Sequence, residues 1–323
     1  MIPFPPHRRA LLALLAAGVA APAWAQGDGT GAIRIKPGAS LLPDAGPDYT
    51  PPTDLSTIAD IYHRMTTAVR VNGAGPFPFV VDTGANQSVI ADNVAAQLGL
   101  AIGEPQPLNS VAGVSLAPVT RATLQASRRP PNEATLSVLP AKALGGAGIL
   151  GLDQLDGSRV TLDFRRQVVV LDAPVELPGA GNEVSLGAQR RDGQLTLVNA
   201  DVAGVRVIAF LDSGAQDTVG NMALRTLAVQ RQPTLPWSQK PLVSVTGQTV
   251  ICDFAELPLL RIGHLTMANW PIAFADLHVF EMWDMIEQPA MLLGVDVLSR
   301  FETICLDFAR DEVRLRLPTA GWG

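Results

Sequence analysis

One aspartate stands out by its position in the chain. Asp82 follows the apolar residues 77–81 and is followed at once by Thr83 and Gly84. A carboxylate directly behind a buried strand is costly to keep charged unless the protein uses it. Glycine lets the chain turn sharply and lets another backbone approach closely. Alone, the tripeptide Asp-Thr-Gly is weak evidence for a site, because it arises by chance in many chains.

The same pattern occurs again 130 residues later, where Asp212, Ser213 and Gly214 follow an apolar run. Three further landmarks recur in the same order, at offsets that grow from 134 to 144 residues. Loops of different length between equivalent elements produce such growth, so we predict two homologous β-rich lobes. The matching stretches are residues 110–113 with 244–247, 148–153 with 291–296, and 162–166 with 306–310.

Two lobes of this kind would bring Asp82 and Asp212 together at a pseudo-twofold axis. Two carboxyls in contact do not both ionise easily, so the pair would hold one proton at moderate pH. The ionised member can take a proton from water while the protonated member donates to a carbonyl oxygen. The titration belongs to the pair, so the sequence leaves open which aspartate carries the proton. Thr83 and Ser213 are expected to hydrogen-bond to the opposite lobe.

The elements that must position these turns are short strands. Residues 66–71 and 77–81 are expected to form a hairpin around a turn at 72–76, and 195–202 pairs with 205–211 in the second lobe. Short helices are expected at 91–98 and 222–227. The Pro- and Gly-containing stretch 174–181 is the best boundary, so we predict lobes at residues 55–173 and 182–320.

The first 25 residues have the composition of an export signal. Arg8 and Arg9 precede an apolar stretch at 11–21, and Ala23-Trp24-Ala25 fits a cleavage site. Only three of the 24 basic residues are lysine, which suggests a GC-rich bacterial genome. We therefore expect a periplasmic or secreted protein without a membrane span, with residues 26–54 as a linker or leader.

Charge limits the partners of the mature protein. The net charge of −6 becomes 22 − 30 = −8 after residues 1–25 are removed, since that segment holds two arginines and no acid. Nucleic acid is therefore a poor candidate partner. Cys252 and Cys305 lie in apolar runs, and both a disulfide and two free thiols stay open.

Residues 82–90 resemble the active-site signature of retropepsin-like aspartic proteases, and residues 212–219 resemble a second copy. The apolar-apolar-Gly elements ending at Gly151 and Gly294 are also similar to that family, and the resemblance covers most of residues 60–318. It implies an all-β, two-lobed, monomeric aspartic endopeptidase that needs no cofactor or metal. By the same resemblance, Asp82 and Asp212 are the catalytic pair, supported by Thr83, Gly84, Ser213 and Gly214; Asn86, Gln87, Gln216 and Asp217 contact the peptide substrate, and Gly113 and Gly247 form flap tips.

Two features modify this interpretation. Ala85 and Ala215 stand where a hydroxyl could donate to the catalytic carboxylates, so we expect an activity optimum between mildly acidic and near-neutral pH. The tyrosines, Tyr49 and Tyr62, both precede the first motif, which disfavours a pepsin-like enzyme with a flap tyrosine.

The alternative from another functional class is a peptide-binding or scaffold protein with the same cleft and no turnover. Two ionisable groups forced together argue against it. Residues 146–151 spell G-x-G-x-x-G, but the expected strand and turn after them do not provide the helix that a dinucleotide site needs. The histidines of the mature chain, His63, His264 and His278, are not at metal-ligand spacing.

Overall fold

The computed structural model describes residues 55–56, 64–126, 129–172, 183–191, 194–202, 204–263 and 265–318. Strands make up 54% of the structure and the helices are short, so the predicted all-β class is confirmed. The predicted signal peptide, the leader at 26–54 and the boundary at 174–181 lie outside the described residues, except that Leu55 and Ser56 follow the leader as a short strand.

The N-terminal half contributes one sheet that closes on itself. Among the described residues its strand order is β2-β3-β8-β4-β7-β6-β5, and β2 also pairs with β6. Strand β3 lies between β2 and β8, so its last three residues are fully buried and read as an unbroken apolar run. The elements are β2 (Thr66–Val71), β3 (Ala74–Val81), β4 (Val89–Ala91), β5 (Gly103–Ser110), β6 (Gly113–Ala126), β7 (Asn132–Leu139), β8 (Gly148–Leu150), α1 (Asp92–Gln97), α2 (Ala141–Leu144) and α3 (Leu152–Leu155).

The C-terminal half repeats this plan strand by strand. Its order is β12-β13-β18-β14-β17-β16-β15, with an added pairing of β12 to β16, as β2 pairs with β6. The recurring landmarks of the sequence therefore correspond to recurring strands. The elements are β12 (Gln194–Val202), β13 (Val205–Leu211), β14 (Val219–Gly220), β15 (Ser238–Val243), β16 (Thr249–Ile262), β17 (Leu265–Phe274), β18 (Ala290–Leu293), α4 (Met222–Arg231), α5 (His278–Met282) and α6 (Val295–Leu298).

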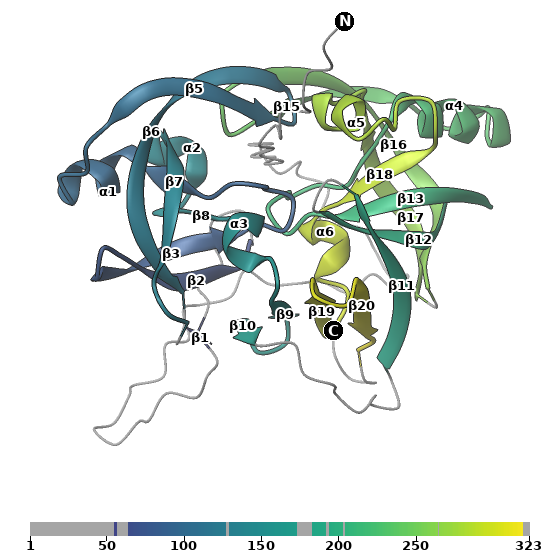
Figure 1. Ribbon diagram of the computed structural model, residues 1–323. Coiled ribbons are helices and arrows are strands. Elements are labelled where there is room, and N and C mark those ends of the chain that lie inside the picture. Colours follow the sequence, from purple (N-terminus) through teal and green to yellow (C-terminus); the bar gives the residue numbers. More distant parts are fainter. Residues whose placement is uncertain are drawn as a thin grey trace, which may run out of the picture.

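Six strands join the halves in the order β1-β10-β9-β19-β20-β11. At the centre β9 pairs with β19, so Thr161 lies opposite Cys305, its equivalent 144 residues later. Figure 1 shows the halves side by side, with this joint sheet on one side of the molecule and β5 and β15 on the opposite side. The strands are β1 (Leu55–Ser56), β9 (Arg159–Asp163), β10 (Val168–Asp172), β11 (Glu183–Arg191), β19 (Thr303–Asp307) and β20 (Glu312–Arg316).

The structure corrects two predicted boundaries. The first hairpin turns at residues 72–73, and β3 already begins at Ala74, because Ala74 pairs with Val71 of β2 inside the expected turn. Helix α4 runs on to Arg231, beyond the predicted residue 227. The side chain of Asn221 caps that helix by accepting from the N–H of Leu224 at 2.9 Å, which supports a longer helix.

The cysteines and the aromatic residues of the C-terminal half have structural positions. Cys252 is buried in β16 and Cys305 is half-buried in β19, and both are free thiols. The apolar side chains between residues 270 and 291 are mostly buried: Phe280 is fully buried, and Trp283 stacks on Phe210 at 3.8 Å between ring centroids. Core packing therefore accounts for most of this cluster.

Candidate active site

Asp82 and Asp212 occupy equivalent turns at the ends of β3 and β13. Both side chains are fully buried. The backbone N–H of Asp82 donates to the carbonyl of Leu150 on β8, and that of Asp212 donates to the carbonyl of Leu293 on β18, each at 3.1 Å. Because β3 and β13 are central strands of matching sheets, each turn is held from both sides by its own half.

Each carboxyl accepts hydrogen bonds from its own turn and packs against the turn of the other half. Oδ1 of Asp82 accepts from the N–H groups of Gly84 and Ala85 at 2.8 and 2.9 Å. Oδ1 of Asp212 accepts from the equivalent N–H groups of residues 214 and 215 at 2.9 and 3.0 Å. In the described part of the chain, the Oδ2 atoms of both aspartates are buried without a hydrogen-bond partner.

The two glycines make the close approach possible. A Cβ placed on Gly84 would lie 2.5 Å from Cγ of Asp212, and a Cβ on Gly214 would overlap the carboxyl of Asp82. Each carboxyl therefore packs against the bare backbone of the opposite turn. Only glycine leaves this space, which explains why it follows the hydroxyl residue in both motifs.

The hydroxyl residues lock the turns together. Thr83 Oγ1 donates to the carbonyl of Leu211 at 2.8 Å, and Ser213 Oγ donates to the carbonyl of Val81 at 2.8 Å. Each hydroxyl also accepts the backbone N–H of the other residue at 3.1 Å. Four buried hydrogen bonds thus join the halves at the predicted positions and fix the two carboxyls relative to each other.

Burial sets the electrostatics of the pair. It raises the pKa of Asp82 to about 7, against the opposing effects of the Gly84 N–H and the positive charge of Arg64. It raises the pKa of Asp212 well above its usual range, and the charge of Asp82 raises it further. Two inequivalent carboxyls of this kind can hold one proton between them near neutral pH and can act as an acid and a base.

The four residues predicted to contact the substrate differ in how far the fold already uses their polar groups. The Oδ1 of Asn86 accepts from Gln194 Nε2 at 2.9 Å, and Gln87 Nε2 donates to the carbonyl of Thr135 at 2.7 Å. Both amides are therefore partly used by the fold. Gln216 Oε1 is buried without a hydrogen-bond partner in the described structure. Burial raises the pKa of Asp217, and nearby Lys240 opposes that shift.

The predicted flap tips lie at two hairpin turns that meet each other. Gly113 and Gly247 have φ values of 135° and 81°, which suit glycine. Ser110 Oγ in the first hairpin donates to Gln248 Oε1 of the second at 3.1 Å. The backbone N–H of His278 donates to the carbonyl of Val111 at 2.9 Å, so α5 also contacts the first hairpin.

Residues 67–156 match the family described as "gag-polyprotein putative aspartyl protease". The matched segment is thus similar to a retropepsin-like aspartyl protease domain, and it contains Asp82 with its supporting turn. It spans strands β2 to β8 and helix α3. It ends before Asp212, whose equivalence to Asp82 comes from the sequence repeat and the shared strand order. No curated protein matched the chain.

The sequence did not single out two further carboxyls, Asp153 and Asp296, which hydrogen-bond to residues that follow the two aspartate turns. Ser88 Oγ donates to Asp153 Oδ1 at 2.7 Å and accepts the N–H of Gly151 at 3.0 Å. In the other half, Thr218 Oγ1 donates to Asp296 Oδ1 at 2.7 Å and accepts the N–H of residue 294 at 3.1 Å. The recurring Gly-x-Asp at 151–153 and 294–296 was the available signal.

Asp296 provides a stability prediction. Burial raises its pKa to about 7, although Thr218 donates to it. Between pH 3.8 and 7 the folded protein keeps this proton and the unfolded chain loses it, so the free energy of unfolding falls as pH rises and levels off above 7. The slope is about 1.4 kcal/mol per pH unit for one proton. Asp296→Asn should remove this part of the slope.

Urea unfolding at pH 4.5, 5.5, 6.5 and 7.5 measures the effect of Asp296→Asn. The exposed Asp92, whose Oδ1 accepts the N–H of Ala141 at 3.0 Å, offers a matched control because asparagine keeps that acceptor. Asp92→Asn should leave the slope near that of the wild type. Equal slopes for wild type and Asp296→Asn would contradict the assignment.

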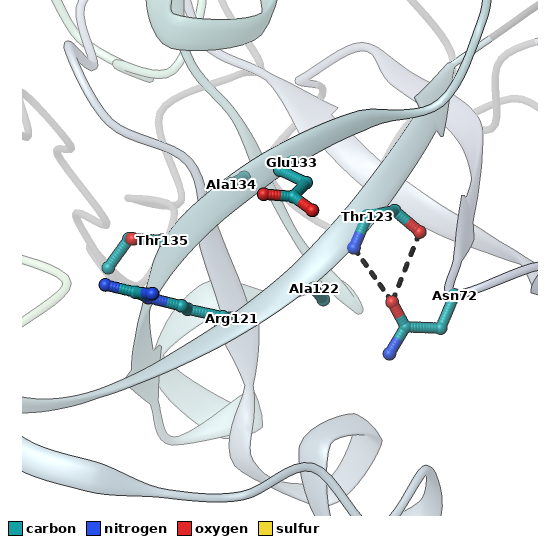
Figure 2. Close-up of a pocket in the computed structure, with 7 residues that line it drawn as sticks. All are labelled: Asn72, Arg121, Ala122, Thr123, Glu133, Ala134 and Thr135. Atoms are coloured by element: carbon teal, nitrogen blue, oxygen red, sulfur yellow. Dashed lines mark hydrogen bonds between the residues drawn. The ribbon is translucent and has the colours of Figure 1, made fainter.

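Two surface pockets lie away from the aspartates. Figure 2 shows a polar pocket of about 490 Å³ on β6 and β7, lined by Arg121 and Glu133, with Asn72 Oδ1 accepting from Thr123. A second pocket of about 300 Å³ is lined by residues of β6, β7 and the turn at Gly247. Neither aspartate lines either pocket.

The described residues also bear on metal ions, dinucleotides and membranes. Among the described residues, no three His, Cys, Asp or Glu side chains gather as metal ligands would. The G-x-G-x-x-G stretch is followed by α3, which has only four residues. No helix in the part of the chain that the structure describes is long and apolar enough to cross a membrane.

Proposed function

We propose that the protein is an aspartic endopeptidase that hydrolyses peptide bonds with water activated between Asp82 and Asp212. The observation that carries this proposal is the pair of interlocked Asp-hydroxyl-Gly turns, in which each buried carboxyl packs against the glycine of the opposite turn. The aspartyl protease match to residues 67–156 supports the same chemistry.

The reaction needs one ionised and one protonated carboxyl. The ionised carboxylate takes a proton from water, whose oxygen attacks the peptide carbonyl carbon while the protonated carboxyl donates to the carbonyl oxygen. The tetrahedral diol then returns a proton to the second carboxyl as the C–N bond breaks. The leaving nitrogen receives the proton that the first carboxyl took from water. The products are a carboxylic acid and an amine, and both carboxyls regain their starting states.

The remaining site residues would bind an extended peptide. Gly113 and Gly247 lie at the turns of the two hairpins, which would cover the substrate, and Asn86, Gln87, Gln216 and Asp217 would contact its backbone. Asn86 and Gln87 already hydrogen-bond within the protein. We therefore expect Gln216 and Asp217 to offer the freer polar groups of the four. The two ends of a bound peptide would then meet different polar groups.

The proposal extends to the processed protein. Export through the signal at residues 1–25 would place a monomer in the periplasm or outside the cell. Its lobes would comprise residues 55–173 and 182–320. Two sets of strands in the same order, connected by the six strands of the joint sheet, support this division. Peptides or proteins would be its substrates, with no cofactor.

The test is cleavage of a peptide library by the purified protein from pH 4 to 8, with Asp82→Asn in parallel. Cleavage that disappears in the variant supports the proposal. Cleavage that persists in Asp82→Asn would assign the activity to other residues or to a contaminant. Saturable peptide binding without turnover would favour the scaffold alternative, because the cleft would then exist without its chemistry.

The pH profile should respond to residues 85 and 215. Both alanines are fully buried, and their N–H groups already donate to the carboxylates. With the pKa of Asp82 raised to about 7, activity should fall as pH drops through that value and protonates the base. A serine hydroxyl at each position would stabilise the charged form and lower the pKa. Ala85→Ser with Ala215→Ser should move the acid limb toward lower pH by roughly half a unit or more.

The measurement is kcat/KM against pH for wild type and the double variant. Ala96, exposed on α1, provides a control, since Ala96→Ser adds a hydroxyl far from the carboxyls. An acid limb at the same pH in all three proteins would show that residues 85 and 215 do not tune the pair.

A further inference from the structure

Two equivalent positions near the aspartates, one in each half, hold a basic and a neutral side chain. Thr66 pairs with Val80 in the first half, and Thr196 pairs with Phe210 in the second. The N–H of Val81 donates to the carbonyl of residue 65 at 2.9 Å, so the first ladder continues toward Asp82. Two residues before each threonine, and opposite the aspartates in this register, stand Arg64 and Gln194, 130 residues apart.

These two residues are both buried but carry different charge. Arg64 is fully buried, and its Nη2 donates to the carbonyl of Leu144 at 2.6 Å. Gln194 is 2% exposed, and its Nε2 donates to the carbonyl of Gly84 at 2.8 Å and to Asn86 Oδ1. The first half thus holds a guanidinium whose charge acts on Asp82, and the equivalent position of the second half holds a neutral amide.

A buried cation favours a negative charge close to it, because the protein interior screens the attraction less than water does. The positive charge of Arg64 lowers the pKa of Asp82 against the larger effect of burial. The leading influences on Asp212 are burial and the charge of Asp82, and both raise its pKa. Two further carboxyls belong to the surroundings of the turns: Asp153 accepts a hydrogen bond from Ser88, and Asp296 accepts one from Thr218. The positive charge of Lys240 lowers the pKa of Asp217.

We propose that Arg64 makes the two carboxyls inequivalent, so that Asp82 is the ionised base that activates water and Asp212 is the acid that protonates the carbonyl oxygen. Arg64 is then a positioning residue that acts through Asp82 and touches neither water nor peptide. Gln194 fills the equivalent place without charge and instead ties the second half to the first turn. This inference rests on the proposed endopeptidase function for its mechanistic meaning.

The assignment orders the protons of the reaction. Water gives a proton to Asp82 and its oxygen bonds to the carbonyl carbon, while the proton of Asp212 moves to the carbonyl oxygen. On collapse, one diol hydroxyl returns its proton to Asp212, the C–N bond breaks, and Asp82 gives its proton to the leaving nitrogen. No step changes an oxidation state, and Arg64 keeps its charge throughout.

The direct test measures each carboxyl by itself. In the Asp212→Asn protein only Asp82 of the pair titrates, and in Asp82→Asn only Asp212 does. Carbon-13 NMR of labelled aspartate carboxyls, followed from pH 3 to 10, should give a pKa for Asp82 at least about one unit below that for Asp212. Equal values, or the opposite order, would overturn the assignment.

The role of Arg64 is tested in the Asp212→Asn background. Arg64→Gln, which copies the residue of the other half, should raise the pKa of Asp82 by about one unit or more, and Arg64→Lys should largely restore it. Arg159, a buried arginine on β9, provides the control, since Arg159→Gln should leave the pKa of Asp82 unchanged. An unchanged pKa of Asp82 in folded Arg64→Gln would also overturn the proposal.

These outcomes separate the inference from the proposed function. The titrations need no turnover, so a protein without peptidase activity would refute the proposed function and still show whether Arg64 orders the pair. An active peptidase with the reverse order would refute only the Arg64 assignment. Should Arg64→Gln not fold, the two single-carboxyl proteins decide, together with Gln194→Lys, which should lower the pKa of Asp212.

Discussion

Asp212→Asn is expected to reduce kcat/KM for peptide cleavage at least about 10³-fold, because an asparagine cannot pass its proton to the carbonyl oxygen or take it back. The fold should tolerate the change. Asp212 is fully buried, and burial raises its pKa well above its usual range, so asparagine replaces a carboxyl that the fold holds in its charged form only at a cost. The unfolding temperature at pH 7 should therefore stay the same or rise.

Steady-state kinetics on one cleaved peptide measure kcat/KM, and thermal unfolding of the same samples measures the unfolding temperature. Asp284 is a matched control because it is exposed and has a φ of 54°, a conformation that asparagine also accepts. Asp284→Asn should retain the wild-type kcat/KM. More than a tenth of the activity surviving in folded Asp212→Asn would remove Asp212 from the mechanism.

Gly214→Ala is expected to lower kcat at least about 10²-fold, because the new methyl group would occupy the space of the Asp82 carboxyl. The carboxyl cannot move without losing the hydrogen bonds from Gly84 and Ala85. Overpacking of this kind should also cost about 1–3 kcal/mol of stability. Gly84→Ala should have a similar effect through the carboxyl of Asp212.

Gly187 on β11 separates steric overlap from the general effect of adding a methyl group. A Cβ there would have no atom within 4 Å, so Gly187→Ala should leave both kcat and the free energy of unfolding close to wild type. Steady-state kinetics and urea unfolding of the three variants provide the comparison. Full activity in Gly214→Ala would mean that the two turns are not packed as closely as their hydrogen bonds indicate.

Local features of the fold were readable from the sequence because they depend on neighbouring residues. Strand β2 has the predicted bounds, and α1 ends before Gly99, whose φ of 61° suits a helix stop. The start of β3 was missed, because Ala74, inside the expected turn, pairs with Val71 of β2. Sheet pairing overrides local turn preference at such positions.

The pairing of Asp82 with Asp212 was also predictable, because a repeated motif implies two equivalent turns. The supporting carboxylates were not singled out, since Asp153 and Asp296 gain their partners Ser88 and Thr218 only when strands β8 and β18 lie beside the turns. Of the two cysteines, whose pairing stayed open, Cys252 is buried in β16 and Cys305 is half-buried in β19, each as a free thiol.

By itself, the sequence determined the all-β class, the two Asp-hydroxyl-Gly motifs and the type of chemistry they suit, since these follow from residue identity and order. Tertiary structure alone decided how closely each carboxyl packs against the opposite turn, and which buried charge acts on Asp82. Arg64 lies 18 residues before Asp82, and nothing in its local sequence marks it. Its influence depends on burial and distance, because both set how strongly a charge acts, and folding alone fixes them.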